Sequence, residues 1–275
     1  MMTTAKRALQ WIQSQLSFEG WPVDSQFRSE SSLGRIATIA GLLGIFLGTH
    51  ICLFSVLILH RCFSLVPVLD EFFSLEQIDM MWQWSGYVVL LCSFHLTEFF
   101  VTAIYNPTVV TAESFLVNHS LDYTAAFLLS ATEFWTRFFL YPFFSTPVFI
   151  VGLGMVLFGQ GIRAIAMATC GASFNHKIQT SKKDTHVLIT HGIYSYFRHP
   201  SYVGFYYWAI GTQLLLNNTL HSFLFAVAST MFFRKRIPYE EESLMNYFPD
   251  QYACYAATTW VGIPFIPPCD KCKIT

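Results

Sequence analysis

Charged residues are scarce in this sequence. Of its 275 residues, 12% are Asp, Glu, Lys or Arg and 53% are hydrophobic, whereas a soluble domain carries about 25% charged residues. The mean hydropathy is +0.44. This scarcity excludes an ordinary soluble domain and indicates a polytopic membrane protein, folded as one hydrophobic unit rather than as two soluble domains.

Several sequence features are also lacking. The net charge is −1 and no block of like charge resembles a binding tail, so no binding to nucleic acid is predicted. The first 24 residues contain neither a long apolar run nor a cleavage site, so we predict no signal peptide. The seven cysteines are scattered and do not form a disulfide framework. We predict no metal site, because Cys269 and Cys272 form a lone CxxC and the histidines of loop 171–199 lack helical ligand spacing.

Long apolar runs, by contrast, are abundant. A transmembrane helix needs about 20 mostly apolar residues, and the runs predict an all-α protein with six to eight transmembrane helices. Six predicted spans are clear: 36–59, 84–105, 122–144, 147–170, 200–217 and 219–234. The number is open because 33–69 is long enough to hold a hairpin, and the first 30 residues could lie flat as an amphipathic helix.

The basic residues predict the orientation. With six spans and a cytosolic N-terminus, 13 of the 16 Lys and Arg residues lie on the cytosolic side. Arg61 alone lies on the opposite side, and Arg137 and Arg163 lie within spans. This distribution follows the positive-inside rule. Both termini, the loop 171–199 and the tail after residue 234 then share the cytosolic face.

The segment 232–255, "FFRKRIPYEEESLMNYFPDQYACY", carries the densest charge in this cytosolic region. Arg236 and Glu240 lie four residues apart, directly after the sixth predicted span. One interpretation is a snorkelling basic cluster that ends the span, followed by a new helix that starts near Pro238 with acidic residues in its first turn. The other interpretation is a functional site.

A second unusual stretch, "RHPSYVGFYYW", opens the fifth predicted span. Pro200 suits the first position of a helix. Arg198 and His199 then lie at the bilayer edge, where charge is costly and usually functional, and we expect them to face a ligand that approaches from the cytosol. Elsewhere, the glycines of "GLGMVLFGQG", residues 152–161, favour close helix packing over a nucleotide-binding turn, because no strand precedes them.

Together these stretches resemble the isoprenylcysteine carboxyl methyltransferase family. The resemblance rests on "RHPSYVGFYYWAIGTQLLL" followed by "FFRKRIPYEEESLMNYFPDQYACYAATTWVGIPFIP", and on the preceding "IRAIAMATCGASFNHKIQTSKKDTHVLITHGIY". It covers about residues 84–267. One departure is Phe248-Pro249, where the family has Phe-Gly.

The resemblance implies an enzyme of the endoplasmic reticulum membrane. Such an enzyme moves a methyl group from S-adenosyl-L-methionine to the C-terminal carboxylate of an S-farnesyl or S-geranylgeranyl cysteine. Its partners would be the lipid bilayer and prenylated protein C-termini such as those of small GTPases. The resemblance also implies N-terminal transmembrane helices in 1–170 and a catalytic half in 171–275 that forms a cytosolic cofactor pocket.

The resemblance further implies the site residues. Arg236 and Glu240 would be catalytic, and Arg236 would bind the substrate carboxylate. The cofactor would be held by Gln179, His186, Val187, Leu188, Ile189, Tyr194, His199, Pro200, Ser201, Tyr202 and Glu240.

Three alternatives compete with this function. A phospholipid N-methyltransferase would use the same cofactor on an amine, and a sterol reductase with a similar C-terminal half would use NADPH. A transporter or lipid-binding module would instead use Glu133, Arg137 and Arg163 to line a pathway through the membrane.

Overall fold

The protein is helical throughout the part of the chain that the structure describes. The computed structural model describes residues 4–16, 29, 31–117, 120–176 and 187–266. Its α-helices are α1 (Thr4–Leu16), α3 (Leu33–Phe63), α4 (Val68–Phe72), α5 (Leu75–Tyr105), α6 (Leu121–Leu140), α7 (Thr146–Cys170), α8 (Pro200–Leu215), α9 (Thr219–Tyr247) and α10 (Pro249–Thr258). Short 3₁₀ helices are η1 (Pro107–Val109), η2 (Ala112–Phe115), η3 (Gly171–Ser173) and η4 (Gly192–Ser195). Within these ranges there is no β-strand, only an isolated parallel bridge between Phe197 and Trp260.

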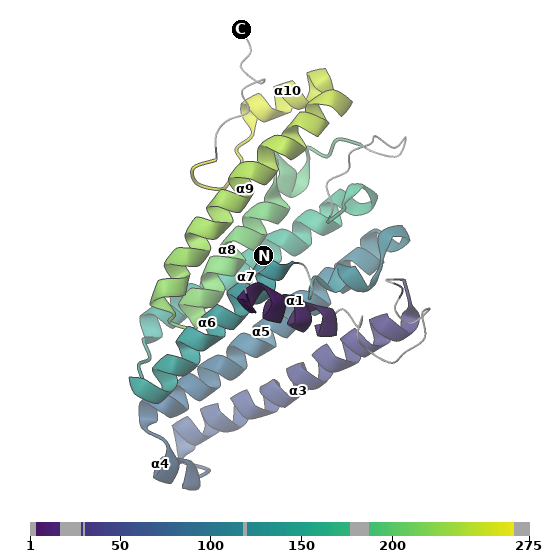
Figure 1. The fold of residues 1–275 in the computed structure, drawn as a ribbon. Helices are drawn as coiled ribbons and strands as arrows, with labels where there is room; N and C mark the ends of the chain where they lie inside the picture. Colours follow the sequence, from purple (N-terminus) through teal and green to yellow (C-terminus); the bar gives the residue numbers. More distant parts are fainter. Residues whose placement is uncertain (1–3, 17–28, 30, 118–119, 177–186, 267–275) are drawn as a thin grey trace. The chain divides into compact units, whose positions relative to one another are not determined.

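The helices, drawn in Figure 1, divide into two compact units. Unit 1 comprises Met1–Phe100, Val110–Phe149 and Leu215–Asn218. Unit 2 comprises Val101–Val109, Ile150–Leu214 and Thr219–Thr275. In unit 1 the helices α3, α5 and α6 lie side by side, and in unit 2 most of α7 lies beside α8 and α9.

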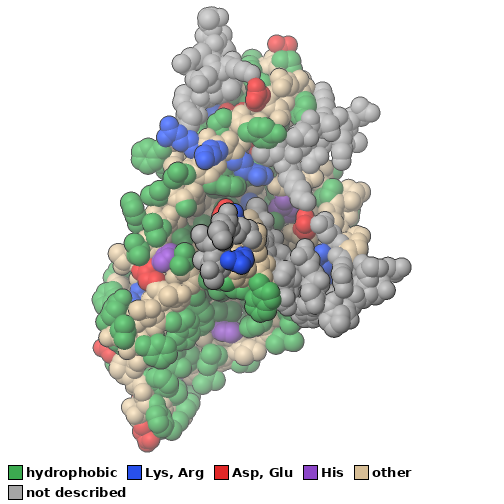
Figure 2. All heavy atoms as spheres, viewed as in Figure 1, with side chains coloured by type: hydrophobic (Ala, Val, Ile, Leu, Met, Phe, Trp, Pro, Cys, Tyr) green, Lys and Arg blue, Asp and Glu red, His purple; other side chains and the backbone are tan. Residues whose placement is uncertain are grey.

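A helix occurs at each of the six predicted spans. Three of them are long and apolar enough by themselves to cross a membrane, namely Leu33–Phe63, Leu75–Tyr105 and Thr146–Ser173. Exposed hydrophobic side chains cover much of the long helices (Figure 2), as expected for surfaces that face lipid. The stretch 33–69 does not form a hairpin of two spans, because α3 runs unbroken for 31 residues. The number of six to eight spans remains a prediction.

In unit 1, a buried arginine caps the turn between α8 and α9. Arg137 of α6 donates hydrogen bonds to the carbonyl oxygens of Leu216 and Asn217, just past the end of α8. The negative end of a helix dipole favours a cation at this position. Gln83 of α5 donates to the carbonyl of Leu215 over 2.7 Å. The bonds of Arg137 give this buried guanidinium partners within the fold, so its burial needs no transport pathway as an explanation.

In unit 2, glycines allow α7 and α8 to approach closely. A Cβ atom placed on Gly159 would lie 2.5 Å from the carbonyl oxygen of Gly204 and 2.6 Å from the backbone nitrogen of Trp208. Similarly, a Cβ atom on Gly204 would lie 2.6 Å from the Cβ of Arg163. This confirms for Gly159 the prediction of close packing. Gly161, by contrast, has open space around the corresponding position.

The crossing of α7 and α8 predicts a matched pair of stability effects. Gly159→Ala should destabilise the protein by about 1–3 kcal/mol, because backbone atoms cannot move aside as a flexible side chain can. Gly161→Ala should leave stability unchanged or raise it slightly, since alanine is the better helix former. Thermal unfolding of both variants in the same detergent checks this. Equal melting temperatures would contradict the close approach.

Helix α9 differs from the prediction. One interpretation of the sequence predicted a new helix that starts near Pro238, but α9 continues to Tyr247 with Pro238 inside it. That prediction is wrong. A proline inside a helix costs about 3 kcal/mol. Burial of the apolar side chains of Phe233 and Ile237, and the hydrogen bonds of Glu241 on the same face of α9, offset this cost. The acidic residues therefore lie within a continuous helix and not in a first turn.

Candidate active site

The start of α8 places four of the predicted site residues, 199–202. The carbonyl oxygen of His199 accepts hydrogen bonds from the backbone N–H groups of Tyr202 and Val203, each over 3.0 Å. Pro200 is the first residue of α8, as predicted, where a missing N–H group costs nothing. Ser201 is buried, and its carbonyl oxygen accepts from the Arg163 guanidinium over 3.1 Å. The first turn of α8 is thus held against α7.

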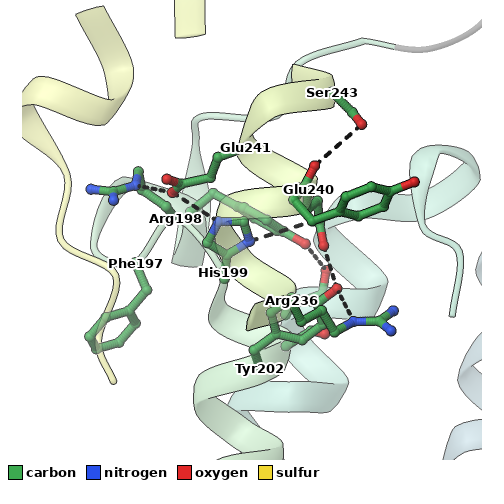
Figure 3. A network of polar contacts seen from close by, with 12 residues as sticks. Phe197, Arg198, His199, Tyr202, Arg236, Glu240, Glu241 and Ser243 are labelled. Atoms are coloured by element: carbon green, nitrogen blue, oxygen red, sulfur yellow. Dashed lines mark hydrogen bonds and ion pairs between the residues drawn. The ribbon is translucent and has the colours of Figure 1, made fainter. Parts of the chain in front are cut away.

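Tyr202 lies at the centre of a polar cluster with two residues of α9 (Figure 3). The Nε of Arg236 donates to the Tyr202 hydroxyl over 2.8 Å, and this hydroxyl in turn donates to the Glu240 carboxylate. Because Arg236 and Glu240 lie four residues apart on one helix, they share a face. The structure therefore brings together Tyr202, Arg236 and Glu240, three of the residues to which the resemblance assigns a role.

Both charged groups of this cluster remain open to further partners. Arg236 also donates to the carbonyl oxygen of His176 over 2.8 Å. Its bonds to described residues therefore use two of the five N–H groups of a guanidinium. The guanidinium carbon lies 5.3 Å from the centre of the Tyr202 ring, a cation–π contact that helps to hold it. The Glu240 side chain is 27% exposed.

Glu241, the next residue on α9, is buried and faces a different side of the helix (Figure 3). Its Oε1 accepts from Arg198 Nε over 2.9 Å and from His199 Nε2 over 3.1 Å. Burial by itself would raise the pKa of this carboxyl group, but the hydrogen bond from His199, together with the positive charge and the hydrogen bond of Arg198, lowers it overall. Glu241 is therefore ionised at neutral pH.

We expected Arg198 to face an approaching ligand, but it is buried and stabilises the fold instead. It is 8% exposed. Besides Glu241, its guanidinium donates to the carbonyl oxygens of Ala256 and Thr259, and its backbone N–H donates to Trp260 over 2.8 Å. These bonds fasten the C-terminal end of α10 to the start of α8.

The remaining residues implied to hold a cofactor are more dispersed. Val187 is exposed, and Ile189 is half-buried. Leu188 packs against a cluster that contains Tyr252 and Tyr255. The carbonyl oxygen of Tyr194, in η4, accepts from the Tyr255 hydroxyl over 2.6 Å. The other two, Gln179 and His186, lie outside the described residues.

Sequence reasoning missed the role of Glu241. It grouped Glu240, Glu241 and Glu242 as acids in the first turn of a helix. On a continuous helix, adjacent residues point about 100° apart, so neighbouring glutamates reach different surroundings. The signal that could have separated Glu241 was the adjacent pair of Arg198 and His199, but its distance in sequence gave no indication of contact.

The cluster joins a cation to an anion at a half-buried position. Arg236 offers N–H donors that suit a carboxylate. Glu240, about one helical turn away, can accept hydrogen bonds from an ammonium group. This arrangement can bind an anionic group and a cationic group side by side. Within the described ranges, no group of three or more His, Cys, Asp or Glu residues is placed to hold a metal ion.

Comparison with known proteins links this geometry to one family. The model of the isoprenylcysteine carboxyl methyltransferase (ICMT) family matches residues 151–246, which include the whole polar cluster. The chain is also similar to a solved structure, that of the eukaryotic intramembrane Ras methyltransferase ICMT without a monobody. The two share 33% identity with a TM-score of 0.72, over 96% of this chain and 88% of the other.

Curated relatives agree with this match. Protein-S-isoprenylcysteine O-methyltransferase from Xenopus laevis is 48% identical over 182 residues, and the human protein of that name is 44% identical over 188 residues. These alignments span 63% and 66% of the two relatives, just under two thirds of their length. The Tribolium castaneum protein of the same name is 39% identical, over 78% of this chain and 76% of its own length.

Proposed function

Because the chain belongs to the isoprenylcysteine carboxyl methyltransferase family, we propose that it methylates the C-terminal carboxylate of prenylated proteins. The methyl donor is S-adenosyl-L-methionine, and the acceptor is an S-farnesyl or S-geranylgeranyl cysteine such as that of processed small GTPases. The observation that carries the proposal is the cluster of Arg236, Tyr202 and Glu240. It offers a cation for the acceptor carboxylate beside an anion for the donor.

The acceptor needs no general base. A C-terminal carboxylate has a pKa near 3.3–3.7 and is already ionised at neutral pH. The enzyme must therefore remove this carboxylate from water and align it with the methyl group. Arg236 does both, since its guanidinium replaces the lost water contacts through charge-assisted hydrogen bonds. Alignment of this kind can contribute about 7–11 kcal/mol to the lowering of a barrier.

The residues around Glu240 fit the donor. When bound, S-adenosyl-L-methionine supplies a methyl group on a sulfonium sulfur that a carboxylate oxygen can attack. Its amino acid end carries an ammonium group, for which the partly exposed Glu240 carboxylate is a suitable acceptor. Tyr202 orients that carboxylate and Arg236 together, because its hydroxyl is bonded to both. The residues 187–189 and Tyr194 lie in the same unit as this cluster and would contact the rest of the donor.

The protein is a multi-pass membrane protein, as its family and its three long apolar helices indicate. We place it in the endoplasmic reticulum membrane, with both termini and the active site facing the cytosol. The distribution of Lys and Arg supports this orientation. The catalytic half is residues 171–275, and a prenyl chain reaches it from the bilayer, since such a chain is more soluble in lipid than in water.

Transfer of a tritiated methyl group tests this function. Purified protein in detergent is given S-adenosyl-L-methionine with either N-acetyl-S-farnesylcysteine or phosphatidylethanolamine. We expect base-labile label on the prenylcysteine and none on the phospholipid. Label on the amine would show a phospholipid N-methyltransferase instead. Binding of NADPH without binding of S-adenosylhomocysteine would show a reductase, and binding of neither would favour a transporter or lipid-binding module.

A further inference from the structure

We propose that Glu241 is a positioning residue that fixes the tautomer of His199. In this tautomer the hydrogen lies on Nε2, and Nδ1 is left as an acceptor beside the Glu240 carboxylate. The two acceptors together bind the ammonium group of the methyl donor. The inference rests on the proposed function. It adds His199 as the second residue that binds the ammonium group, and Glu241 as the buried residue that orients His199.

The hydrogen bonds of His199 decide the tautomer. Its Nε2 lies 3.1 Å from Glu241 Oε1, within hydrogen-bond distance of an ionised carboxylate that can only accept. Its Nδ1 lies 3.7 Å from Glu240 Oε1, which is too far for a hydrogen bond. Among the described residues, therefore, the proton of a neutral His199 has an acceptor at Nε2 and none at Nδ1.

The surroundings of His199 hold its ring in place. The ring is stacked on Tyr202, with the ring centres 5.5 Å apart and the planes inclined by 7°. His199 is 5% exposed. Its acceptor is held as well, because Arg198 binds the same Oε1 of Glu241 and is itself fastened to the end of α10. A rotated ring would leave the buried Glu241 without this donor, which is costly.

This arrangement leaves two acceptors close together. The His199 Nδ1 atom, which carries the lone pair, lies 3.7 Å from Glu240 Oε1. The other carboxylate oxygen, Glu240 Oε2, accepts a hydrogen bond from the Tyr202 hydroxyl. An electron-rich pair of this kind attracts a group with several donors and a positive charge. A primary ammonium group carries three N–H donors on one atom, so it can bind Nδ1 and Oε1 at the same time.

The test compares two ligands that differ only in this ammonium group. Calorimetry gives the Kd values of S-adenosylhomocysteine and of its desamino analogue for the wild type and for Arg198→Met/Glu241→Met. The double variant replaces the buried ion pair by apolar side chains, an exchange that proteins often tolerate. We expect S-adenosylhomocysteine to bind it about tenfold more weakly, with a change below about threefold for the desamino analogue. Glu241→Gln, whose amide oxygen still accepts from Nε2, should retain the wild-type preference.

Each pattern of Kd values leads to a different conclusion. An equal loss for both ligands would mean that Glu241 acts only on the fold, and no loss for either would also overturn the proposal. A wild type that binds neither ligand would contradict the proposed function itself.

Should the double variant fail to fold, the wild type still provides a test. The ¹³C shifts of the labelled imidazole of His199, assigned by difference with His199→Gln, report the tautomer. We expect the Nε2–H form, and an Nδ1–H form would overturn the inference.

Discussion

Arg236→Ala should reduce kcat/KM for N-acetyl-S-farnesylcysteine by about 100-fold or more. The substituted enzyme must remove the acceptor carboxylate from water without a cationic partner, and loss of one member of such a pair costs about 2–5 kcal/mol. The loss should occur with the acceptor and not with the donor, so the Kd of S-adenosylhomocysteine should change little. Steady-state kinetics with varied acceptor, together with calorimetry of the donor product, measure both quantities.

Two further variants make this result specific. Arg236→Lys keeps the charge but loses the planar fork and the Nε bond to Tyr202, so its loss should be intermediate, about tenfold. Lys235→Ala removes the exposed neighbouring cation of α9 and should leave the kinetics near those of the wild type. Kinetics of Arg236→Ala that equal those of Lys235→Ala would remove Arg236 from the mechanism.

Glu240→Gln should weaken the binding of S-adenosylhomocysteine by about 10- to 100-fold. A hydrogen bond to a charged group contributes roughly 1.5–3 kcal/mol, and the amide carries no charge to attract the ammonium group. The amide oxygen can still accept from the Tyr202 hydroxyl, so Arg236 should keep its position. Calorimetry measures the Kd, and kinetics at saturating donor should recover most of the wild-type rate.

The control for this change lies two residues further along α9. Glu242 is exposed and outside the polar cluster, so Glu242→Gln should keep the wild-type Kd. A donor affinity that is unchanged in Glu240→Gln would contradict the placement of the ammonium group. An affinity that falls equally in both variants would instead indicate a general electrostatic effect of the acidic segment.

Local features of the chain were enough to predict the helices and part of the site. Each of the six apolar runs became a helix, in which the backbone hydrogen bonds are made within the segment itself. The pair Arg236 and Glu240 was predictable for a similar reason, since a spacing of four residues places two side chains on one helical face. Pro200 at the start of α8 follows from the chemistry of proline alone.

Predictions failed where contacts distant in sequence determine the structure. Pro238 suggested a break, but burial along one face of α9 kept the helix continuous. Arg198 looked open to the cytosol, yet the carbonyl oxygens of Ala256 and Thr259, about 60 residues later, enclose its guanidinium. Neither contact has a signature in the local sequence.

The sequence by itself determined that this protein is helical and apolar, and where its charged residues are concentrated. These properties depend on composition and on periodicity within single helices. Only the tertiary structure decided that Glu240 and Glu241, adjacent in the chain, have different environments. Glu240 joins Tyr202 at a half-buried surface, while Glu241 is buried against Arg198 and His199. The physical reason is that a helix directs adjacent side chains about 100° apart, and the helices packed around it decide what each one meets.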